Sequence, residues 1–405
     1  MFSKALPRSF SPEQIFVLSS VLVNGGNYLY NIILGRMLGP TQFSDAALFV
    51  TLLLVLSFIA MTFQLGVTKF VATDVVNSSS IVRWIWKRAL ALGLCIGAAF
   101  IFFSDALQEI FKTESGNAFL IFGLFVPIYF AMSIRRGYLQ GRQDFLNLSG
   151  SYQMEMWARL LLTLSLVLLW RSEPLLAVVT GIGFSFVLGL YPFRKLYNTA
   201  KERLSPSIKG QIKVFLWYTA LYEGTQIICN NSDILLVKHY FGTEEAGLYA
   251  SLALIGRVIY FSSWMLIMLL LPKVIKSRRE GKCTKRLFNN YLTIITLLIL
   301  VLLTASFVIP ETMVLLLFGE EYMPIAPYLG LYAIATSLFA FSNLFVYYFM
   351  SLDRFFPIIL SALFGILQIV GIMGFHNSFA EVIWVQIALM AILLSLQATY
   401  YRWKS

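Results

Sequence analysis

Long apolar stretches alternate with short polar connections along the whole chain. Each stretch is close to the length of a membrane-spanning helix, which needs about 20 mostly apolar residues. The stretches cover residues 13–37, 44–70, 84–103, 117–138, 147–170, 174–193, 211–238, 246–272, 288–309, 324–350, 356–375 and 379–400. The pattern therefore predicts an all-α membrane protein with about twelve transmembrane helices.

The first stretch is predicted to be a helix of the mature protein rather than a cleaved signal peptide. Ser11-Pro12-Glu13-Gln14 is typical of a helix start, with Ser11 as the N-cap, Pro12 in the first turn and Gln14 reaching back. Polar residues interrupt the apolar run that follows, and no small-residue cleavage site comes after a short apolar core.

Polar residues recur at helical spacing inside several of these stretches. Glu223, Gln226, Asn230 and Asp233 fall on one face of the predicted helix 211–238. The predicted helix 13–37 has a similar face, made of Asn24, Asn27 and Asn31.

Charged residues also lie deep inside two of the predicted spans. Glu155 and Arg159 lie four residues apart in 147–170, a spacing at which they can pair, and Arg257 lies in 246–272. A charge near the bilayer centre costs about 2.5–3.5 kcal/mol even on the lenient insertion scale, so such residues normally face a bundle interior or a wet cavity.

These faces predict a hydrated cavity between helices, with two kinds of candidate residue. The candidates for binding a substrate are Arg159, Arg257, Asn24, Asn27, Asn31, Gln226, Asn230, Arg36 and Lys69, and the candidates for coupling to an ion are Glu223, Asp233 and Glu155. Other interpretations stay open. Asparagines also hold helices together, long basic side chains near helix ends, such as Arg36, Lys238 and Lys69, can reach the membrane surface, and Glu155 can serve only to hold Arg159.

Composition agrees with a membrane protein. The chain has 405 residues, of which 59% are hydrophobic and 13% are charged, and its mean hydropathy is +0.77. Soluble domains have about 25% charged residues. One core cannot bury this much apolar surface, so lipid is the expected solvent.

Basic residues recur in every second connection between the predicted helices, and the remaining connections have a net negative charge or none. Arg135 and Arg136 at the end of 117–138, for example, are assigned with Arg142 to the connection that leads to 147–170, whereas Glu244 and Glu245 follow 211–238. The positive-inside rule then predicts an inner-membrane protein with both termini in the cytoplasm. This topology also explains most of the net charge of +11, which therefore does not indicate nucleic-acid binding.

Signatures of enzymes, metals and cofactors are missing from the sequence. The three cysteines and two histidines are scattered, and neither a glycine-rich phosphate loop nor a nucleophile elbow occurs. We therefore expect a protein that is not an enzyme and has no cofactor or metal.

The chain is predicted to consist of two related halves. A charged connection at 201–212 separates an N-terminal lobe, 1–200, from a C-terminal lobe, 213–405, with six helices in each. Asn27 aligns with Asn230, Gly39 with Gly242 and Ser44 with Gly247. Because each half begins in the cytoplasm and has an even number of helices, the predicted repeat is parallel, a pseudo-twofold about the membrane normal. A chance match of short glycine-containing turns is the alternative.

Four segments in order resemble the polysaccharide transporters, the Wzx-type flippases of O-antigen and capsule repeat units, in the multidrug/oligosaccharidyl-lipid/polysaccharide exporter superfamily. The segments are 34–49, 135–145, 231–249 and 310–332, spread over nearly the whole chain, and each alone is degenerate. The resemblance implies a flippase that moves an undecaprenyl-pyrophosphate-linked oligosaccharide to the outer leaflet by alternating access. Its expected partners are this lipid-linked glycan, membrane lipid, a coupling ion (H⁺ or Na⁺) and a polysaccharide polymerase.

Three rival functions are kept as alternatives. A multidrug exporter of the same superfamily would favour acidic rather than cationic lobes, and a membrane glycan polymerase would need larger outer connections. A scaffold in a glycan-export complex is the third. Lipid II flippases of the superfamily usually carry two further C-terminal helices, a difference that counts against that assignment.

Overall fold

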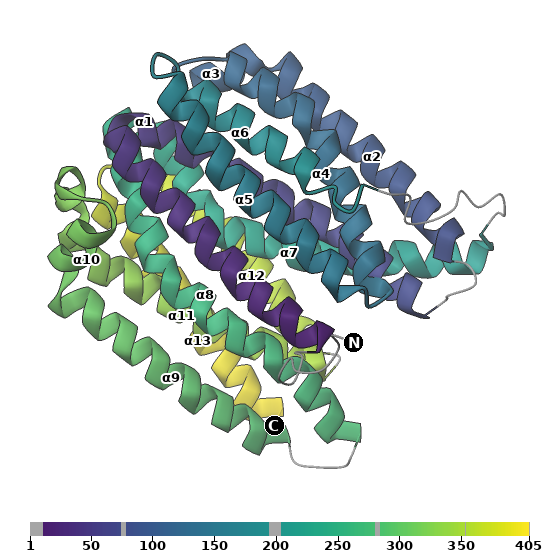
Figure 1. Ribbon diagram of the computed structural model, residues 1–405. Coiled ribbons are helices and arrows are strands. Elements are labelled where there is room, and N and C mark those ends of the chain that lie inside the picture. Colours follow the sequence, from purple (N-terminus) through teal and green to yellow (C-terminus); the bar gives the residue numbers. More distant parts are fainter. Residues whose placement is uncertain (1–10, 74–77, 194–203, 280–283, 353, 405) are drawn as a thin grey trace, which may run out of the picture. The chain divides into compact units, whose positions relative to one another are not determined.

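The computed structural model describes residues 11–73, 78–193, 204–279, 284–352 and 354–404. Within these ranges every regular element is a helix: thirteen α-helices and one short 3-10 helix (Figure 1). The first six helices are α1 (Pro12–Thr73), α2 (Ser78–Phe102), α3 (Ser104–Phe111), α4 (Asn117–Gly141), α5 (Phe145–Leu169) and α6 (Pro174–Leu188). The others are α7 (Pro206–Tyr240), α8 (Thr243–Arg279), α9 (Thr284–Val308), α10 (Pro310–Leu317), η1 (Glu320–Ile325), α11 (Ala326–Ser351), α12 (Phe356–Gly374) and α13 (Phe379–Lys404).

The predicted membrane-protein class is confirmed. In the described residues, eight helical stretches are long and apolar enough to cross a membrane. The longest of them, Gln14–Ala72, lies in α1. Helices α5 and α7 are less apolar because they carry the polar and charged residues of the site described below.

The separation of the first two predicted spans is marked by a kink. The apolar runs 13–37 and 44–70 both belong to α1, and Gly39 between them has φ of 67° and ψ of 171°. Pro40 follows, so the chain changes direction where glycine alone adopts this backbone easily. The predicted helix start is confirmed: the Gln14 amide donates to Ser11 Oγ at 3.3 Å, and the Ser11 amide donates to Gln14 Oε1 at 2.9 Å.

Two short helices, α3 and α10, were not predicted. Each has eight residues, too few to cross a membrane, and both lie in what the apolar pattern predicts as connections. They have equivalent places in the element order: each follows a 25-residue helix, α2 or α9, and precedes a long helix, α4 or α11.

The order of elements repeats along the chain. In the first half, the kinked α1 is followed by a long helix, a short helix and three longer ones. In the second half, α7 and α8 are separated by a break at Gly242. A long helix, a short helix and three longer ones then follow again, with η1 between α10 and α11. Gly39 and Gly242, which the sequence aligns, thus mark equivalent bends.

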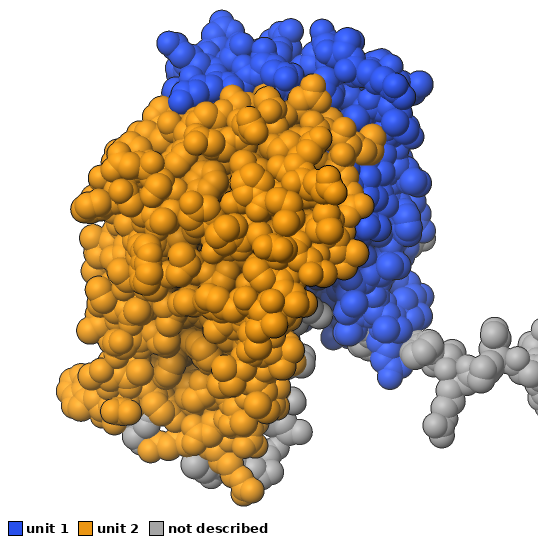
Figure 2. All heavy atoms as spheres, turned by 90° about the vertical axis from the view of Figure 1, so that its left-hand side faces the viewer, with its two compact units in different colours: residues 1–34, 52–223 blue, residues 35–51, 224–405 orange. Residues whose placement is uncertain are grey.

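The chain divides into two compact units, shown in different colours in Figure 2. Unit 1 contains residues 1–34 and 52–223, and unit 2 contains residues 35–51 and 224–405. The predicted lobe boundary at 201–212 stays a prediction, and residues 201–203 of it lie outside the described residues.

Close helix packing builds each unit. In unit 1, α2 packs on α4 and α6 packs on α4 and α5; in unit 2, α11 packs on α8, α9 and α13. Glycine permits the closest approach: a Cβ on Gly97 of α2 would lie 2.5 Å from the Gly123 carbonyl oxygen of α4. Small residues at such contacts let helix backbones come together in a membrane.

Candidate functional site

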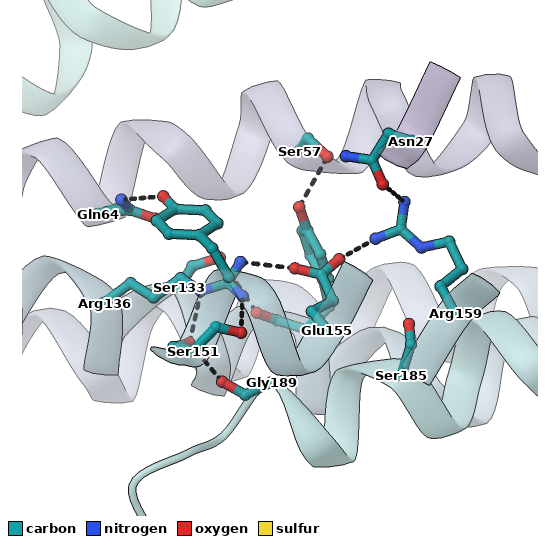
Figure 3. A network of polar contacts seen from close by, with 12 residues as sticks. Asn27, Ser57, Gln64, Ser133, Arg136, Ser151, Glu155, Arg159, Ser185 and Gly189 are labelled. Carbon is teal, nitrogen blue, oxygen red and sulfur yellow. Dashed lines mark hydrogen bonds and ion pairs between the residues drawn. The ribbon is translucent and has the colours of Figure 1, made fainter. Parts of the chain in front are cut away.

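Three charged side chains meet inside unit 1, and we call them the charged triad: Arg136, Glu155 and Arg159. Arg136 Nη1 lies 2.7 Å from Glu155 Oε2, and Arg159 Nη2 pairs with Glu155 Oε1. Figure 3 shows Glu155 between the two guanidinium groups, with Arg136 reaching it from α4 and Arg159 from α5. The predicted pairing of Glu155 with Arg159 is confirmed.

The guanidinium group of Arg136 makes contacts through all of its nitrogens and through its flat face. Its Nε donates to Ser151 Oγ at 2.8 Å and its Nη2 to the Ser151 carbonyl oxygen at 2.9 Å. Its guanidinium carbon lies 3.9 Å from the centre of the Tyr152 ring, whose hydroxyl accepts a 3.0 Å hydrogen bond from Gln64 Nε2. Ser151 in turn donates to the Gly189 carbonyl oxygen at 2.6 Å. These contacts fix Arg136 between α4, α5 and the end of α6.

Arg159 is held more loosely than Arg136. Besides Glu155, its Nη1 donates to Asn27 Oδ1 at a long 3.3 Å. Its Nε is buried without a hydrogen-bond partner within the described part of the chain. Asn31, one turn further along α1, donates to the Asn27 carbonyl oxygen at 2.8 Å, and its own buried Oδ1 has no partner among the described residues. One buried donor, Arg159 Nε, and one buried acceptor, Asn31 Oδ1, therefore remain without a hydrogen bond to the described residues on this side of the triad.

The triad carries excess positive charge. Two guanidinium groups face one carboxylate, so one positive charge is left in the interior of a helix bundle. Buried ions are normally neutralised or matched by a counter-ion, because desolvation costs several kcal/mol per ion. A buried cation with no counter-ion among the described residues is a candidate for binding an anion.

Arg136 lies in a helix and not in a connection, contrary to the prediction, whereas the predicted cytoplasmic side of this end stays a prediction. α4 continues through it to Gly141, and Arg136 is only 3% exposed. The sequence places it beside Arg135 and near Arg142, a basic cluster of the kind that marks a membrane surface. The neighbouring Gly137 is the one residue in the sequence that indicates close packing at this position. Its backbone packs against the Gln64 carbonyl oxygen of α1, which would lie 2.5 Å from a Cβ.

A second charged pair lies in unit 2. Arg257 Nη2 of α8 lies 2.8 Å from Asp233 Oδ1 of α7. Tyr332 and Tyr249 donate their hydroxyls to Asp233 Oδ2 at 2.7 and 3.2 Å, and Gln386 Nε2 donates to the Tyr249 hydroxyl at 2.9 Å. One cation faces one carboxylate, so this cluster has no net charge.

A cavity of about 20 Å³ adjoins this pair. Its lining includes Asn230, Arg257, Tyr332, Gln368 and Gln386. That volume is enough for about one water molecule. The predicted polar face of α7 continues beside it, where Gln226 accepts from the Tyr260 hydroxyl at 2.9 Å and donates to Asn343 Oδ1 at 3.1 Å.

The predicted site residues at the kink of α1 belong to a different arrangement. Arg36 donates to the Leu317 and Leu315 carbonyl oxygens at 2.9 and 3.1 Å, and also to that of Leu316, so it covers the C-terminal end of α10. Lys238 does not reach a membrane surface, contrary to the interpretation considered for it. Its side chain is 2% exposed, and its Nζ lies 2.6 Å from Asp45 Oδ1.

Three remaining candidates differ in their surroundings. Asn24 is exposed on α1, and Lys69 is exposed with its Nζ 4.1 Å from the centre of the Phe215 ring. Glu223 of α7 is only 7% exposed, yet it forms no hydrogen bond or ion pair with the described residues. The functional roles predicted for these residues stay predictions.

No metal centre is found in the described ranges, where no group of three or more His, Cys, Asp and Glu side chains comes together. The polar groups that do converge are guanidinium, carboxylate, amide and hydroxyl groups. Such groups bind anions and sugars by charge and hydrogen bonding.

Comparison with known proteins gives consistent matches. A family described as "Polysaccharide biosynthesis protein" matches residues 33–327. The succinoglycan biosynthesis transport protein ExoT of Rhizobium meliloti (strain 1021) is 22% identical over 348 residues, which are 82% of this chain and 67% of that protein.

Two solved structures share the fold. An inward-facing multidrug resistance MATE family transporter of the MOP superfamily superposes with a TM-score of 0.79 and 11% identity, covering 93% of both chains. The lipid II flippase MurJ, in an inward closed conformation, superposes with a TM-score of 0.73 and 12% identity, covering 96% of this chain and 87% of that one. The helices thus adopt the fold of these transporters.

Proposed function

The chain belongs to the polysaccharide biosynthesis protein family, whose members are transporters rather than enzymes, and we propose that it is a flippase for a lipid-linked oligosaccharide. Its substrate is a glycan joined through pyrophosphate to a polyprenyl lipid such as undecaprenol. The transporter moves this head group from the inner to the outer leaflet of the cell membrane for the assembly of a surface polysaccharide such as O-antigen or capsule.

The proposed architecture has twelve spans in two six-helix lobes, with both termini in the cytoplasm. Three observations support it: α1 contains two apolar runs on either side of its kink, the order of elements repeats along the chain, and the fold is that of MATE transporters. A parallel pseudo-twofold repeat allows the lobes to rock about a substrate bound between them, which is alternating access.

The observation that carries the proposal is the excess positive charge of the charged triad. The bilayer excludes the pyrophosphate most strongly, because the cost of burying an anion is far larger than that of burying a sugar hydroxyl. Arg159 replaces the water around this group, since its buried Nε has no partner among the described residues and its bond to Asn27 is long. A guanidinium binds phosphate oxygens by forked hydrogen bonds.

Arg257 takes a different role in this proposal from Arg159. Its charge is matched by Asp233, and two tyrosine hydroxyls complete the carboxylate's hydrogen bonds. A neutral and satisfied pair gives no net attraction for an anion, so we assign Arg257 to the structure of unit 2. The amides of Asn24, Asn27, Asn31, Gln226 and Asn230 remain the proposed partners of the sugars.

The membrane potential favours the proposed direction of transport. Outward movement of a negative head group across an inside-negative membrane is favoured by about 2.3 kcal/mol per charge per 100 mV. A coupling ion adds to this through Glu223, the one ion-coupling candidate of the three that has no cationic partner in the described residues.

The proposal is tested by mass spectrometry of lipids from cells that lack the gene. We expect an intact repeat unit to accumulate on its polyprenyl-pyrophosphate carrier while the surface polymer disappears. Unchanged carrier-linked glycan together with new drug sensitivity would instead identify a multidrug exporter, and the flippase proposal would be wrong.

A further inference from the structure

Arg136 is the most completely satisfied member of the charged triad. Its nitrogens bind Glu155 Oε2, Ser151 Oγ and the Ser151 carbonyl oxygen, and its flat face lies on the Tyr152 ring. At 3% exposure, it offers no face to a bound molecule. Whatever it contributes to substrate binding must therefore act through its neighbours.

We propose that Arg136 is a positioning residue that neutralises Glu155 and so leaves the charge of Arg159 available to a pyrophosphate. This inference rests on the proposed function, because it takes the pyrophosphate of a lipid-linked substrate as the anion. It adds a residue that the sequence had assigned to a surface connection.

The argument is one of charge balance. Glu155 places one carboxylate oxygen on Arg136 and the other on Arg159. With Arg136 present, the three groups have a net charge of one positive unit. Without it, Glu155 and Arg159 form a neutral pair of the same kind as Asp233 and Arg257 in unit 2. In a low-dielectric interior, the loss of one unit charge a few ångströms from a bound anion strongly weakens the attraction.

Geometry adds a second effect to the charge balance. Glu155 and Arg159 are four residues apart on α5, so they can pair without any third group. Arg136, fixed by Ser151 and Tyr152, holds one carboxylate oxygen away from Arg159. The two oxygens are thus divided between two arginines, as Figure 3 shows.

A purely structural role for Arg136 makes the opposite prediction for a double substitution. If Arg136 serves only to link α4 with α5, removing Glu155 as well takes away further contacts and makes the protein worse. If Arg136 serves to balance Glu155, removing both groups restores the single positive charge of Arg159 and restores binding.

The experiment measures binding to the purified full-length protein in detergent. The probe is farnesyl pyrophosphate, with farnesol as the neutral ligand of the same chain length. The variants are Arg136→Gln, Glu155→Gln, the double variant Arg136→Gln/Glu155→Gln and the conservative Arg136→Lys. Arg171→Gln is the matched control, because it removes one positive charge from an exposed turn.

We expect Arg136→Gln to bind farnesyl pyrophosphate about tenfold or more weakly than the unsubstituted protein. Glu155→Gln and the double variant should bind it at least as tightly as the unsubstituted protein, while Arg136→Lys and Arg171→Gln leave the affinity unchanged. Farnesol affinity should be the same throughout, since it carries no charge.

A folded double variant that binds more weakly than Arg136→Gln would overturn the proposal, as would a parallel loss of farnesol binding. If Arg136→Gln does not fold, the double variant and Arg136→Lys still decide between the roles, because loss of pyrophosphate binding in either folded protein contradicts the charge balance. If the binding experiment contradicts the role of Arg136 but the deletion cells accumulate carrier-linked glycan as expected, the proposed function still stands. If the double variant regains farnesyl pyrophosphate binding but the deletion cells accumulate no carrier-linked glycan, only the flippase proposal is wrong.

Discussion

Three buried carboxylates, each within a predicted apolar span, have different neighbours in the structure. Glu155 lies between two arginines, and Asp233 is matched by Arg257 and two tyrosines. Glu223, on the same helix as Asp233, has no ion-pair or hydrogen-bond partner within the described ranges. A carboxylate that is neither solvated nor paired bears the desolvation cost of its charge without compensation. Under the proposed function, Glu223 is therefore the candidate for taking up and releasing a proton during transport.

Substitution of Glu223 by Gln should abolish the dependence of transport on a proton gradient. Gln resembles the protonated carboxyl but cannot release a proton, so the Glu223→Gln protein should retain the transport that the membrane potential drives. Flipping of a lipid-linked glycan is measured in proteoliposomes with an imposed pH gradient, acid on the outer side. The unsubstituted protein should be stimulated by the gradient and Glu223→Gln should not.

The control for this prediction is Glu109→Gln, which removes an exposed carboxylate of α3 and should keep the full stimulation. Stimulation of Glu223→Gln to the level of the control would show that coupling does not pass through this residue.

The charged triad shows how far single residues can be interpreted from sequence. The spacing of Glu155 and Arg159 on one helix is enough to predict their contact, which is confirmed. Arg136 is 19 positions from Glu155 and lies on another helix, so its contact depends on how α4 packs against α5. Helical periodicity carries no information on such packing, and a basic residue near a helix end is ordinarily placed at the surface.

At the scale of elements, hydrophobic length is the property that made the helices predictable. Every predicted apolar run falls on a helix of the structure, because about 20 apolar residues in a membrane leave the backbone no other way to satisfy its hydrogen bonds. α3 and α10 were not predicted because a helix of eight residues is too short to be recognised from the length of an apolar run. Hydrophobic length also could not predict that residues 35–51 group with unit 2, because this grouping depends on contacts with residues far along the chain.

We call residues 35–51 the kink segment, and their packing against α8 is unusually close. A Cβ on Gly247 would lie 1.8 Å from the Pro40 carbonyl oxygen, so only glycine fits there without a backbone shift. Ser44, the residue that the sequence aligns with Gly247, lies in the same segment and accepts a 2.9 Å hydrogen bond from Lys238 Nζ. The start of α8 thus depends on the bend in α1.

Gly247→Ala should destabilise the protein by about 1–3 kcal/mol, the usual cost of overpacking. The reason is that Pro40 must move away from α8, which strains the bend at Gly39. Thermal unfolding followed by tryptophan fluorescence should show a melting temperature several degrees lower. Gly210→Ala is the matched control, since its Cβ would meet nothing within 4 Å, and an equal effect in both variants would contradict the close-packing argument.

At the scale of the whole molecule, the kink segment is connected to unit 1 by sequence, whereas its contacts described here lie within unit 2. It is continuous in sequence with both parts of unit 1, residues 1–34 and 52–223, but it is grouped with unit 2. Lys238 and Asp45 form a buried ion pair there, Arg36 covers the end of α10, and the Tyr322 hydroxyl donates to the Gly35 carbonyl oxygen at 2.8 Å. These contacts lie within unit 2, so they must break if the proposed alternating access moves α1 as a single helix together with unit 1.

Cross-linking the kink segment to α7 should therefore stop transport without stopping substrate binding. Asp45→Cys and Lys238→Cys are introduced together after the three native cysteines are replaced, and a short cleavable bis-thiol linker joins them. The cross-linked protein should lose transport of lipid-linked glycan in proteoliposomes almost entirely, keep its affinity for farnesyl pyrophosphate, and recover transport when the linker is cleaved. Linking Asn377→Cys to Glu381→Cys, which replace residues hydrogen-bonded at 2.9 Å at the start of α13, is the control and should leave transport intact. Undiminished transport by the cross-linked 45–238 protein would mean that the kink segment stays with unit 2 throughout the cycle, and the moving boundary would then lie on either side of it, at residues 34–35 and 51–52.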